Sequence, residues 1–396
     1  MKIIDLFAGC GGMSLGFEMA GYDILLANEI DDWASDTYKA NHKKTIFVQE
    51  DIRKVKRWDR FFPTGKQPKV DGIVGGPPCQ GFSLSGNRDS NDPRNSLFMD
   101  FVKCVKHFKP SFFVMENVKG LLSMRTAKRD PVINIILEEF ADSGYRTTYS
   151  VLNSAWFGVP QLRERVFVIG ISQDNPFNES LIFPQPRLAP EAYISVEMAI
   201  SDLPFIESGE GEEIQDYNSN PSNKYQFWAR KDSGKLFNHV AMRHTNRLIE
   251  RFKVIKPGQS VAHVPEEHSA LKRGNPKIRS GKIFGQNNMR TVAGLPAPTV
   301  AASFQSNFIH PFLNRNFTAR EGARLQSFPD RYVFKGKRTT MSWEKNLSQY
   351  QQIGNAVPPL LAFAIAENIY KYFSNLKNIR DTGGGRRPVQ MPLFSS

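Results

Sequence analysis

The chain has 396 residues, and its 52 lysines and arginines against 39 aspartates and glutamates give it a net charge of +13 at pH 7. This length exceeds what one hydrophobic core usually supports and predicts two domains. The three cysteines cannot build a disulfide framework and lack metal-ligand spacing, so we expect a reducing compartment and no metal site. The basic excess argues against an enzyme for small neutral molecules and favours a polyanionic partner such as nucleic acid.

The chain opens on a strand-like run, KIIDLF, and not on a charged and apolar leader. No run of about 18 apolar residues suggests a membrane span. We therefore expect a soluble protein of the cytoplasm with no membrane partner.

Strand and helix patterns alternate through the first part of the chain, as apolar runs separated by amphipathic stretches. Such alternation is typical of an α/β fold with a doubly wound, mostly parallel sheet. The predicted strands are 3–7, 24–27, 45–48, 70–74, 112–115, 146–152 and 165–171, and the predicted helices are 14–20, 32–41, 96–108 and 131–141.

A glycine-rich turn, DLFAGCGG at residues 5–12, follows the first predicted strand. Glycines before a helix let the backbone approach an anionic or nucleoside ligand, although many such turns bind nothing. Glu29 ends the second strand and Asp51 the third, and carboxylates there can accept hydrogen bonds from a ribose and from an adenine amine. Either acid can equally be a solvated loop carboxylate or a helix N-cap.

The stretch VDGIVGGPPCQGFSLSG, residues 70–86, places Cys79 directly after a predicted strand. Pro77 and Pro78 stiffen the turn, and the two preceding glycines allow close backbone approach. Ligands bind at the carboxyl ends of strands in open α/β sheets, so the Cys79 sulfur is a candidate nucleophile. Taken alone, a cysteine in this place is also compatible with an inert core residue.

Seven motifs, in this order, resemble those of the DNA cytosine methyltransferases that methylate ring carbon 5. They are DLFAGCGG (5–12), NEID (28–31), GGPPCQGFS (75–83), ENV (116–118), QLRERVFVIG (161–170), TARE with ARLQSFPD (318–330) and QIGNAVPP (352–359). The resemblance covers nearly the whole chain. It implies a class I S-adenosylmethionine-dependent methyltransferase fold with a second, smaller, irregular target-recognition domain.

The resemblance also implies domain boundaries. Residues 1–180, completed by 342–380, would form the catalytic domain that binds the cofactor. Residues 181–341 would form the target-recognition domain, and the glycine-rich end, 381–396, a flexible tail.

Covalent catalysis is the chemistry that the resemblance implies. Cys79 would add to ring carbon 6 of a flipped-out cytosine, and Glu116 would bind ring nitrogen 3. Arg163 and Arg165 lie two residues apart, so on one strand face both would reach the cytosine carbonyl and its neighbours, unless they form a strand-edge salt bridge. Residues 80–95 would form a lid that closes over the DNA. The sequence does not identify the base that removes the carbon 5 proton.

The implied cofactor is S-adenosylmethionine, which becomes S-adenosylhomocysteine. Glycines would approach it closely, Glu29 would hold its ribose, and Asp51 would border its adenine. Two members of the implied pocket come from the far end of the chain, which predicts that the apolar helix 360–372 folds back beside the first strand. The implied pocket comprises Phe7, Gly9, Gly11, Glu29, Ile30, Asp51, Ile52, Pro78, Leu97, Asn355 and Val357.

The regular alternation fails between residues 172 and 298, where glycines, asparagines and basic residues gather. The resemblance assigns this region to reading the target in the major groove, with phosphate contacts from lysine and arginine. The sequence does not decide which residues read bases. A helix over 319–329 would organise this domain. The basic residues are Lys224, Arg230, Lys231, Lys235, Arg243, Arg247, Arg251, Lys253, Lys256, Lys272, Arg273, Lys277, Arg279, Lys282 and Arg290.

Three alternatives remain open. A transfer RNA cytosine methyltransferase shares most motifs, but the chain contains no CFT tripeptide. A catalytically silent DNA-binding relative is disfavoured by the intact Cys79, Glu116, Arg163 and Arg165. An oxidoreductase with a dinucleotide fold is disfavoured by the missing G-x-G-x-x-G spacing.

With no long region ahead of the motifs, the sequence favours a compact, monomeric bacterial or phage enzyme acting on double-stranded DNA. A genetic partnership with a restriction endonuclease that cuts the same unmethylated site is one hypothesis for its context. Regulatory methylation without restriction fits the sequence equally well.

Overall fold

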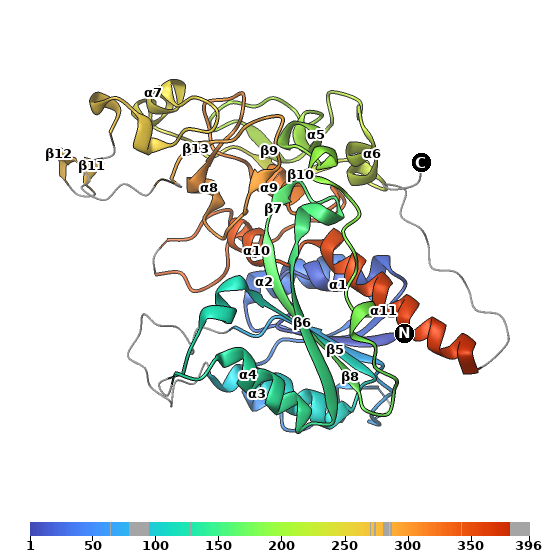
Figure 1. Cartoon of the computed structure of the whole chain (residues 1–396). Coiled ribbons are helices and arrows are strands. Elements are labelled where there is room, and N and C mark those ends of the chain that lie inside the picture. The colour runs from blue at the N-terminus through green and yellow to red at the C-terminus, as the bar shows by residue number, and fades with distance from the viewer. Residues whose placement is uncertain are drawn as a thin grey trace. The chain divides into compact units, whose positions relative to one another are not determined.

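The computed structural model describes residues 1–63, 65–78, 95–126, 129–269, 271–272, 275–279, 285, 287–341 and 343–380. The chain divides into two compact units, each coloured by residue number in Figure 1. Unit 1 comprises Met1–Asn153, Glu164–Arg187 and Val357–Gln390, and unit 2 comprises Ser154–Arg163, Leu188–Ala356 and Met391–Ser396. This division places residues 154–163 and 342–356 in unit 2, whereas the sequence grouped them with the catalytic domain, and it places residues 181–187 in unit 1, whereas the sequence grouped them with the recognition domain. The predicted tail, 381–396, lies outside the described residues.

Unit 1 is built on a seven-stranded sheet in the order β3-β2-β1-β4-β5-β8-β6. Strands β1 to β5 pair in parallel, and β8 runs antiparallel to both of its neighbours. The predicted α/β fold with a doubly wound, mostly parallel sheet is therefore confirmed. The strands are β1 (Lys2–Leu6), β2 (Asp23–Asn28), β3 (Ile46–Val48), β4 (Gly72–Gly75), β5 (Phe112–Val118), β6 (Tyr145–Asn153) and β8 (Glu164–Ser172).

Helices cover both faces of this sheet (Figure 1), with α3 and α4 on one face and α1, α2 and α11 on the other. The buried runs of β1, β4 and β5 pack against α3 and α4, where Phe113 and Phe140 stack with ring centroids 3.9 Å apart. The helices are α1 (Gly12–Met19), α2 (Asp32–Asn41), α3 (Asn95–Phe108), α4 (Val132–Ala141) and α11 (Pro359–Arg380), with short 3-10 helices at Ile52–Lys54, Asp59–Phe61, Lys119–Ser123 and Glu179–Leu181.

The C-terminal helix α11 packs directly on α1, the helix that follows the first strand. A Cβ on Gly16 would lie 2.4 Å from the Cβ of Ala362 and 2.5 Å from the carbonyl oxygen of Pro359, so only glycine permits this approach. The Tyr22 hydroxyl donates to the Ala366 carbonyl at 3.0 Å. The predicted return of this helix to the start of the chain is confirmed.

Unit 2 is irregular, as predicted, and within its described ranges the strands pair only two at a time. Its strands are β7 (Gln161–Leu162), β9 (Gly211–Gln215), β10 (Leu236–Val240), β11 (Leu271–Lys272), β12 (Asn275–Arg279), β13 (Met289–Arg290), β14 (Ala297–Pro298) and β15 (Phe308–Ile309). Its helices are α5 (Val196–Ile200), α6 (Lys224–Arg230), α7 (Asn246–Val254), α8 (Phe304–Asn307), α9 (Ala319–Leu325) and α10 (Gln349–Asn355), with 3-10 turns at Ser154–Phe157, Pro190–Ala192, Val261–His263 and Glu266–His268.

Helix α9 is shorter than the predicted 319–329. Thr318 and Glu321 form a capping box at its start. Its end is set by Ser327, which adopts a left-handed φ of 62°, while the Phe328 amide donates back to the Ala323 carbonyl. A helix cannot continue through a left-handed residue, and the sequence offered no glycine there to mark the stop.

Buried arginines hold the loops of unit 2 around α9. Arg324 binds Asp330 through two hydrogen bonds of 2.6 Å and also donates to Asp202. Arg315 makes a two-point contact with Glu321 at 2.7 and 2.8 Å. Arg320 donates to the carbonyls of Phe237, Pro329 and Tyr332. These guanidinium groups tie segments that have no regular structure of their own.

Candidate active site

The loop between β1 and α1 has an unusual backbone. Phe7, Gly9 and Gly11 have φ values of 57°, 53° and 92°. A left-handed conformation is natural for glycine but strained for phenylalanine, and such strain is concentrated at functional sites. A Cβ built on Gly9 would meet no atom within 4 Å, so the loop faces open space there. The space and the exposed backbone fit a ligand that approaches closely.

Glu29 braces this loop from the end of β2. Its Oε2 accepts the Gly9 amide at 2.9 Å, and its Oε1 accepts the amides of Ile30 and Asp31. Burial raises the pKa of Glu29, and these three amide donors oppose the shift. The neighbouring Ile30 side chain is 61% exposed, which is unusual for an isoleucine beside a buried acid. Together they offer a carboxylate and an apolar surface at one strand end.

Asp51 caps the 3-10 helix that begins at Ile52. Its carboxylate accepts the Arg53 amide and pairs with the Arg53 guanidinium at 2.6 Å. The hydrogen bond from the Arg53 side chain lowers the pKa of Asp51. The N-cap interpretation is therefore confirmed, and it leaves the carboxylate ionised at the end of β3. Ile52 itself is buried in the core.

The turn after β4 is fixed against β5. Asn117 donates from Nδ2 to the Pro77 carbonyl at 3.0 Å, and its Oδ1 accepts the Val118 amide. Pro78 is exposed, and Leu97 in α3 is half-buried against the core. Cys79 and the predicted lid at 80–95 lie outside the described residues, apart from the backbone of Asn95 at the start of α3.

Glu116 and Arg165 form an ion pair beside this turn. Arg165 Nε lies 3.0 Å from Glu116 Oε1, and both side chains are about 85% buried, with 15% and 13% of their surfaces exposed. Glu116 Oε2 faces Gly76, where a Cβ would lie only 3.1 Å away. Burial lowers the pKa of Arg165, while the Glu116 carboxylate raises it. The structure thus brings together two of the predicted catalytic residues.

Arg163 is placed differently from Arg165. The two were predicted on one strand face, but β8 begins at Glu164 and Arg163 precedes it. Arg163 donates from Nη1 to the Val300 carbonyl at 2.8 Å and from Nη2 to the Ala356 carbonyl at 3.2 Å, and it is 1% exposed. The prediction of a shared strand face was wrong because the strand pairing of β7 with β14 ends at Leu162, before Arg163.

Asn355 and Val357 lie on either side of the boundary between the two units. Asn355 ends α10 in unit 2 and is exposed, whereas Val357 is buried in unit 1 just ahead of α11. The grouping of Asn355 with the unit 1 residues stays a prediction.

The two cysteines that the structure describes are poor nucleophiles. Cys10 and Cys104 are each 2% exposed. Burial raises the pKa of Cys10 to about 12 and also raises that of Cys104. Both thiols therefore stay protonated at neutral pH, and a thiol is far less nucleophilic than a thiolate.

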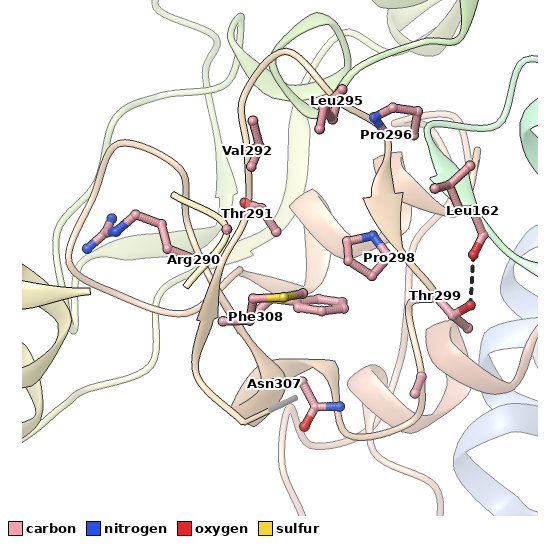
Figure 2. A pocket seen from close by; sticks show the side chains of 13 residues that line it. Leu162, Arg290, Thr291, Val292, Leu295, Pro296, Pro298, Thr299, Asn307 and Phe308 are labelled. Atoms are coloured by element: carbon pink, nitrogen blue, oxygen red, sulfur yellow. Dashed lines mark hydrogen bonds between the residues drawn. The ribbon is translucent and has the colours of Figure 1, made fainter. Parts of the chain in front are cut away.

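Unit 2 contains a cavity of about 680 Å³ (Figure 2). Its walls are mainly apolar, from residues such as Leu295, Pro298 and Phe308. Among its polar residues, Thr299 donates to the Leu162 carbonyl and Arg290 points its guanidinium away from the cavity, onto carbonyls including those of Phe252 and His310. Among the described residues, the Asn307 side chain makes only long local hydrogen bonds, of 3.3 Å with Ser303 and 3.5 Å with Ser306.

Several basic residues predicted to bind phosphate have structural partners instead. Arg290 makes five hydrogen bonds within unit 2 and is 6% exposed. Arg230 stacks on the Tyr217 ring at 3.7 Å, Arg251 donates to the carbonyls of His268 and Ser269, and Lys235 pairs with Asp216. The side chains of Lys272, Lys277 and Arg279 and all of Arg273 and Lys282 lie outside the described part.

Sequence reasoning missed Gly76, Asn117 and Ser14 as parts of the site. Gly76 and Asn117 were inside quoted motifs, but nothing in their pattern showed that one faces Glu116 and the other fixes the turn. Ser14 donates to the buried Asp5. A buried contact between residues on different elements has no periodic signal in the sequence.

Neither a metal site nor a membrane helix is seen in the part of the chain that the structure describes. There, no three histidine, cysteine or acidic side chains are grouped so as to hold a metal ion. No helix there combines the length and the apolar character that crossing a membrane needs.

Comparison with known proteins adds three findings. The model of the family described as C-5 cytosine-specific DNA methylase matches residues 1–371. The type II methyltransferase M.DdeI of Desulfomicrobium norvegicum is 60% identical over 100% of this chain and 95% of its own length, and M1.HphI of Haemophilus parahaemolyticus is 37% identical over 95% and 88%. A crystal structure from an Escherichia coli prophage, described as a DNA modification methyltransferase, aligns with a TM-score of 0.73 and 26% identity over 94% of this chain and 99% of its own.

Proposed function

The chain belongs to the C-5 cytosine-specific DNA methylases and transfers a methyl group to carbon 5 of cytosine in DNA, and we propose that Cys79, Glu116 and Arg165 carry the chemistry. It is a type II modification methyltransferase, with full-length relatives of that class. The observation that supports the residue assignment is the Glu116–Arg165 pair, held beside the turn that leads into Cys79. The predicted activity and enzyme class are confirmed by the family match.

Cys79 acts as the nucleophile. Its thiolate adds to carbon 6 of the cytosine, and the electron pair of the 5,6 double bond moves to make carbon 5 nucleophilic. After carbon 5 is methylated, its proton is removed by a base and the cysteine leaves, which restores the double bond. The protonated state of the buried Cys10 and Cys104 leaves Cys79 as the cysteine suited to this role.

Glu116 and Arg165 recognise the Watson–Crick edge of the flipped cytosine. Arg165 Nε holds Glu116 Oε1, so the carboxyl group is oriented with Oε2 on the Gly76 side, where it meets ring nitrogen 3. Arg165 Nη1 donates a hydrogen bond to the Glu164 carbonyl at 2.8 Å, which leaves Nη2 to donate to the cytosine carbonyl. Because both groups are largely buried, their hydrogen bonds act in a medium of low dielectric constant.

Arg163 supports the site indirectly, because its side chain binds backbone carbonyl groups of unit 2. Its guanidinium joins the carbonyls of Val300 and Ala356, two segments far apart in the chain. We assign it to shaping these segments rather than to direct contact with the base.

S-adenosylmethionine supplies the methyl group when bound, and the residues at the ends of β1, β2 and β3 fit it. The open space at Gly9 accommodates the close approach of a ligand, Glu29 presents a braced carboxylate to the ribose, and the exposed Ile30 offers an apolar face to the adenine. Phe7, Gly11, Asp51, Ile52, Pro78, Leu97 and Val357 of unit 1 and Asn355 of unit 2 complete the proposed cofactor residues.

Target recognition is assigned to unit 2 and to the predicted recognition domain, residues 181–341. A flipped base implies a double-stranded substrate. Asn307 is the candidate base reader in the cavity of Figure 2, because within the described ranges its amide is held only by long local bonds and an asparagine amide can pair with an adenine edge. Exposed basic residues of this unit, such as Lys231 and Lys256, then contact phosphates.

The biological setting follows from the relatives. Type II methyltransferases among them support modification of DNA within a restriction-modification system, and hence a genetic partnership with an endonuclease for the same site. We place the enzyme with DNA in the bacterial cytoplasm and treat it as a monomer, with its proposed catalytic residues on one chain.

The test compares Cys79→Ser with a matched cysteine variant, Cys104→Ala. Each protein is incubated with tritiated S-adenosylmethionine and unmethylated genomic DNA, and the product is sequenced after bisulfite conversion. We expect wild type and Cys104→Ala to protect cytosines within one short motif, and Cys79→Ser to protect none. Substantial methylation by Cys79→Ser would show that the nucleophile lies elsewhere.

A trapping experiment isolates the covalent step. In DNA with 5-fluorocytosine at the target, the fluorine cannot leave as a proton does, so the adduct with the cysteine persists. Wild type should give a complex that survives denaturing electrophoresis, and Cys79→Ser should give none. A trapped Cys79→Ser complex would refute the assignment.

A further inference from the structure

Asp5, at the end of β1, begins a buried chain of hydrogen bonds. The Ser14 hydroxyl in α1 donates to Asp5 Oδ2 at 2.6 Å, and the Tyr38 hydroxyl of α2 lies 2.7 Å from the same Ser14 oxygen. The three residues are 1%, 0% and 0% exposed. Since the Ser14 proton is given to Asp5, Tyr38 is the donor in the second bond. The two hydrogen bonds thus link β1 to α1 and α1 to α2.

These hydrogen bonds hold the strained loop between β1 and α1 at both of its ends. Asp5 lies two residues before Phe7 and Ser14 three residues after Gly11, so both ends of the loop are held by one hydrogen bond. Glu29 supports the middle of the loop through the Gly9 amide. The conformation at Phe7 needs such support, because left-handed phenylalanine is unfavourable by itself.

The charges around Asp5 are negative. Glu29, after β2, and Glu18, in α1, both raise the pKa of Asp5. Glu18 in turn lies 2.9 Å from His42 Nδ1, and His42 stacks on Tyr38 with ring centroids 4.3 Å apart. Within the described ranges, Asp5 forms no salt bridge with a lysine, arginine or histidine. Its carboxyl group is therefore buried without a cation beside it, and its hydrogen bonds come from the hydroxyl and the backbone amide of Ser14.

We propose that Asp5 is a positioning residue that fixes the cofactor loop through Ser14 and Tyr38 and, when ionised, favours the positively charged sulfur of S-adenosylmethionine over the neutral sulfur of S-adenosylhomocysteine. This inference rests on the proposed cofactor site. The loop that Asp5 holds is the one that approaches the cofactor, and a buried carboxylate with no cation beside it attracts a positive charge brought nearby. Ionised Asp5 would thereby contribute a preference for the substrate form of the cofactor over the product.

The ionisation of Asp5 makes this proposal measurable. Burial raises the pKa of Asp5 to about 7, and the Ser14 hydrogen bond opposes the rise. A nearby positive charge stabilises the ionised form, so binding of S-adenosylmethionine should release a proton near neutral pH. Binding of S-adenosylhomocysteine, which lacks the sulfonium, should release less.

Calorimetry of the wild-type protein in buffers of different ionisation enthalpy measures this release. If full ionisation of Asp5 raises the preference for S-adenosylmethionine over S-adenosylhomocysteine about fivefold, as for two charges interacting across part of a protein, the preference should rise about threefold between pH 6 and pH 8. The matching proton release is roughly 0.4 per bound cofactor near pH 6.7. In Asp5→Asn both the rise and the difference in proton release should vanish.

Two further variants separate positioning from a general effect on folding. Ser14→Ala removes a bond that lowers the Asp5 pKa, so its proton release should move to higher pH. Ser35→Ala is the matched control, because Ser35 is a fully buried serine of α2 whose hydroxyl has no hydrogen-bond partner among the residues that the structure describes, and it should behave as wild type.

The outcomes distinguish this inference from the proposed function. If Asp5→Asn folds, binds both ligands and keeps the wild-type preference and proton release, the inference is overturned. If the wild-type protein binds neither ligand, the proposed cofactor site itself fails. If Asp5→Asn does not fold, Ser14→Ala decides, because an unshifted proton release in that variant also overturns the inference.

Discussion

The two units of this protein bury different kinds of side chain. In unit 1 a continuous apolar core lies between the strands and helices, with Phe113, Phe140 and Tyr145 in ring contact. In unit 2 the largest fully buried side chains include Arg163, Arg315, Arg320 and Arg324. The first unit is organised by apolar packing on a regular sheet, whereas the second depends in addition on guanidinium groups that satisfy carbonyls and carboxylates.

This difference suits the role that we propose for each unit. Parallel strands end at one edge of the sheet, so an apolar core places Glu29 and Glu116 at defined strand ends. Loops that must vary with the recognised sequence cannot rely on regular pairing, and their carbonyl groups need donors. An arginine supplies five N–H groups in a fixed geometry and can join several loops at once. The cost is that a missing member leaves a buried charge without a partner.

The largest effect should come from Arg324→Met. The substitution leaves Asp330 and Asp202 buried near each other without the guanidinium that binds both. Breaking such a group should lower the free energy of unfolding by about 3 to 5 kcal/mol. Urea denaturation followed by circular dichroism measures the loss.

The matched variant in unit 1 is Phe113→Leu, which shortens a core side chain but leaves no polar group unsatisfied. It should cost about 1 kcal/mol, as for a hydrophobic exchange of similar volume. Equal losses for the two variants would contradict the distinction between the units.

Acid should affect the two units in opposite directions. Burial lowers the pKa of His310 in unit 2 to about 4, so the unfolded state binds more protons as the pH falls from 6.5, and the unit loses stability. The lowered pKa of Glu321, which Arg315 maintains against burial, adds a further loss below pH 4.5. Asp5 in unit 1 has a pKa raised to about 7, so its folded state binds the extra proton and gains stability as the pH falls from 7 to 4. Each effect is on the order of 3 kcal/mol.

Hydrogen exchange read by mass spectrometry, corrected for the pH dependence of intrinsic exchange, tests this opposition. Between pH 7.5 and pH 5, protection should fall in β10 and α9 of unit 2 and rise in β1 and α1 of unit 1. In Asp5→Asn the rise in unit 1 should be absent while the fall in unit 2 remains. A common change in both units would mean that neither group controls local stability.

The same contrast explains what the sequence could predict of the fold. The strands and helices of unit 1 follow from apolar periodicity, because each buries one face against its neighbours. The interactions that shape unit 2 join residues far apart, such as Asp202 to Arg324 and Tyr217 to Asp330, and carry no local pattern. The sequence therefore predicted that this domain is irregular, but it did not predict the contacts that hold it together. The helix predicted over 319–329 also ran past Ser327, where α9 has already ended.

The sequence predicted only those site residues that lie in a recognisable motif or at the end of a predicted strand. These led to Glu29, Glu116 and Arg165, which the structure places at one edge of the sheet or beside it. The motif also led to Arg163, whose partners depend on the path of distant loops. Asp5 was predicted as part of a glycine-rich turn, and its role became visible only when Ser14 and Tyr38 were placed beside it.

The smallest effect should come from Gly76→Ala, which tests whether the site depends on the close fit in unit 1. The added methyl group would lie 3.1 Å from Glu116 Oε2, so the carboxylate must shift by a few tenths of an ångström. The free energy of unfolding should change by less than about 1 kcal/mol, because the contact is with the end of a side chain. The methylation rate should fall about tenfold, since a small displacement of a catalytic group weakens the bonds that it makes in the transition state. Single-turnover kinetics with saturating DNA measures this rate directly. A Gly76→Ala enzyme with the wild-type rate would show that Glu116 tolerates displacement, and that the apolar core does not need to position it so closely.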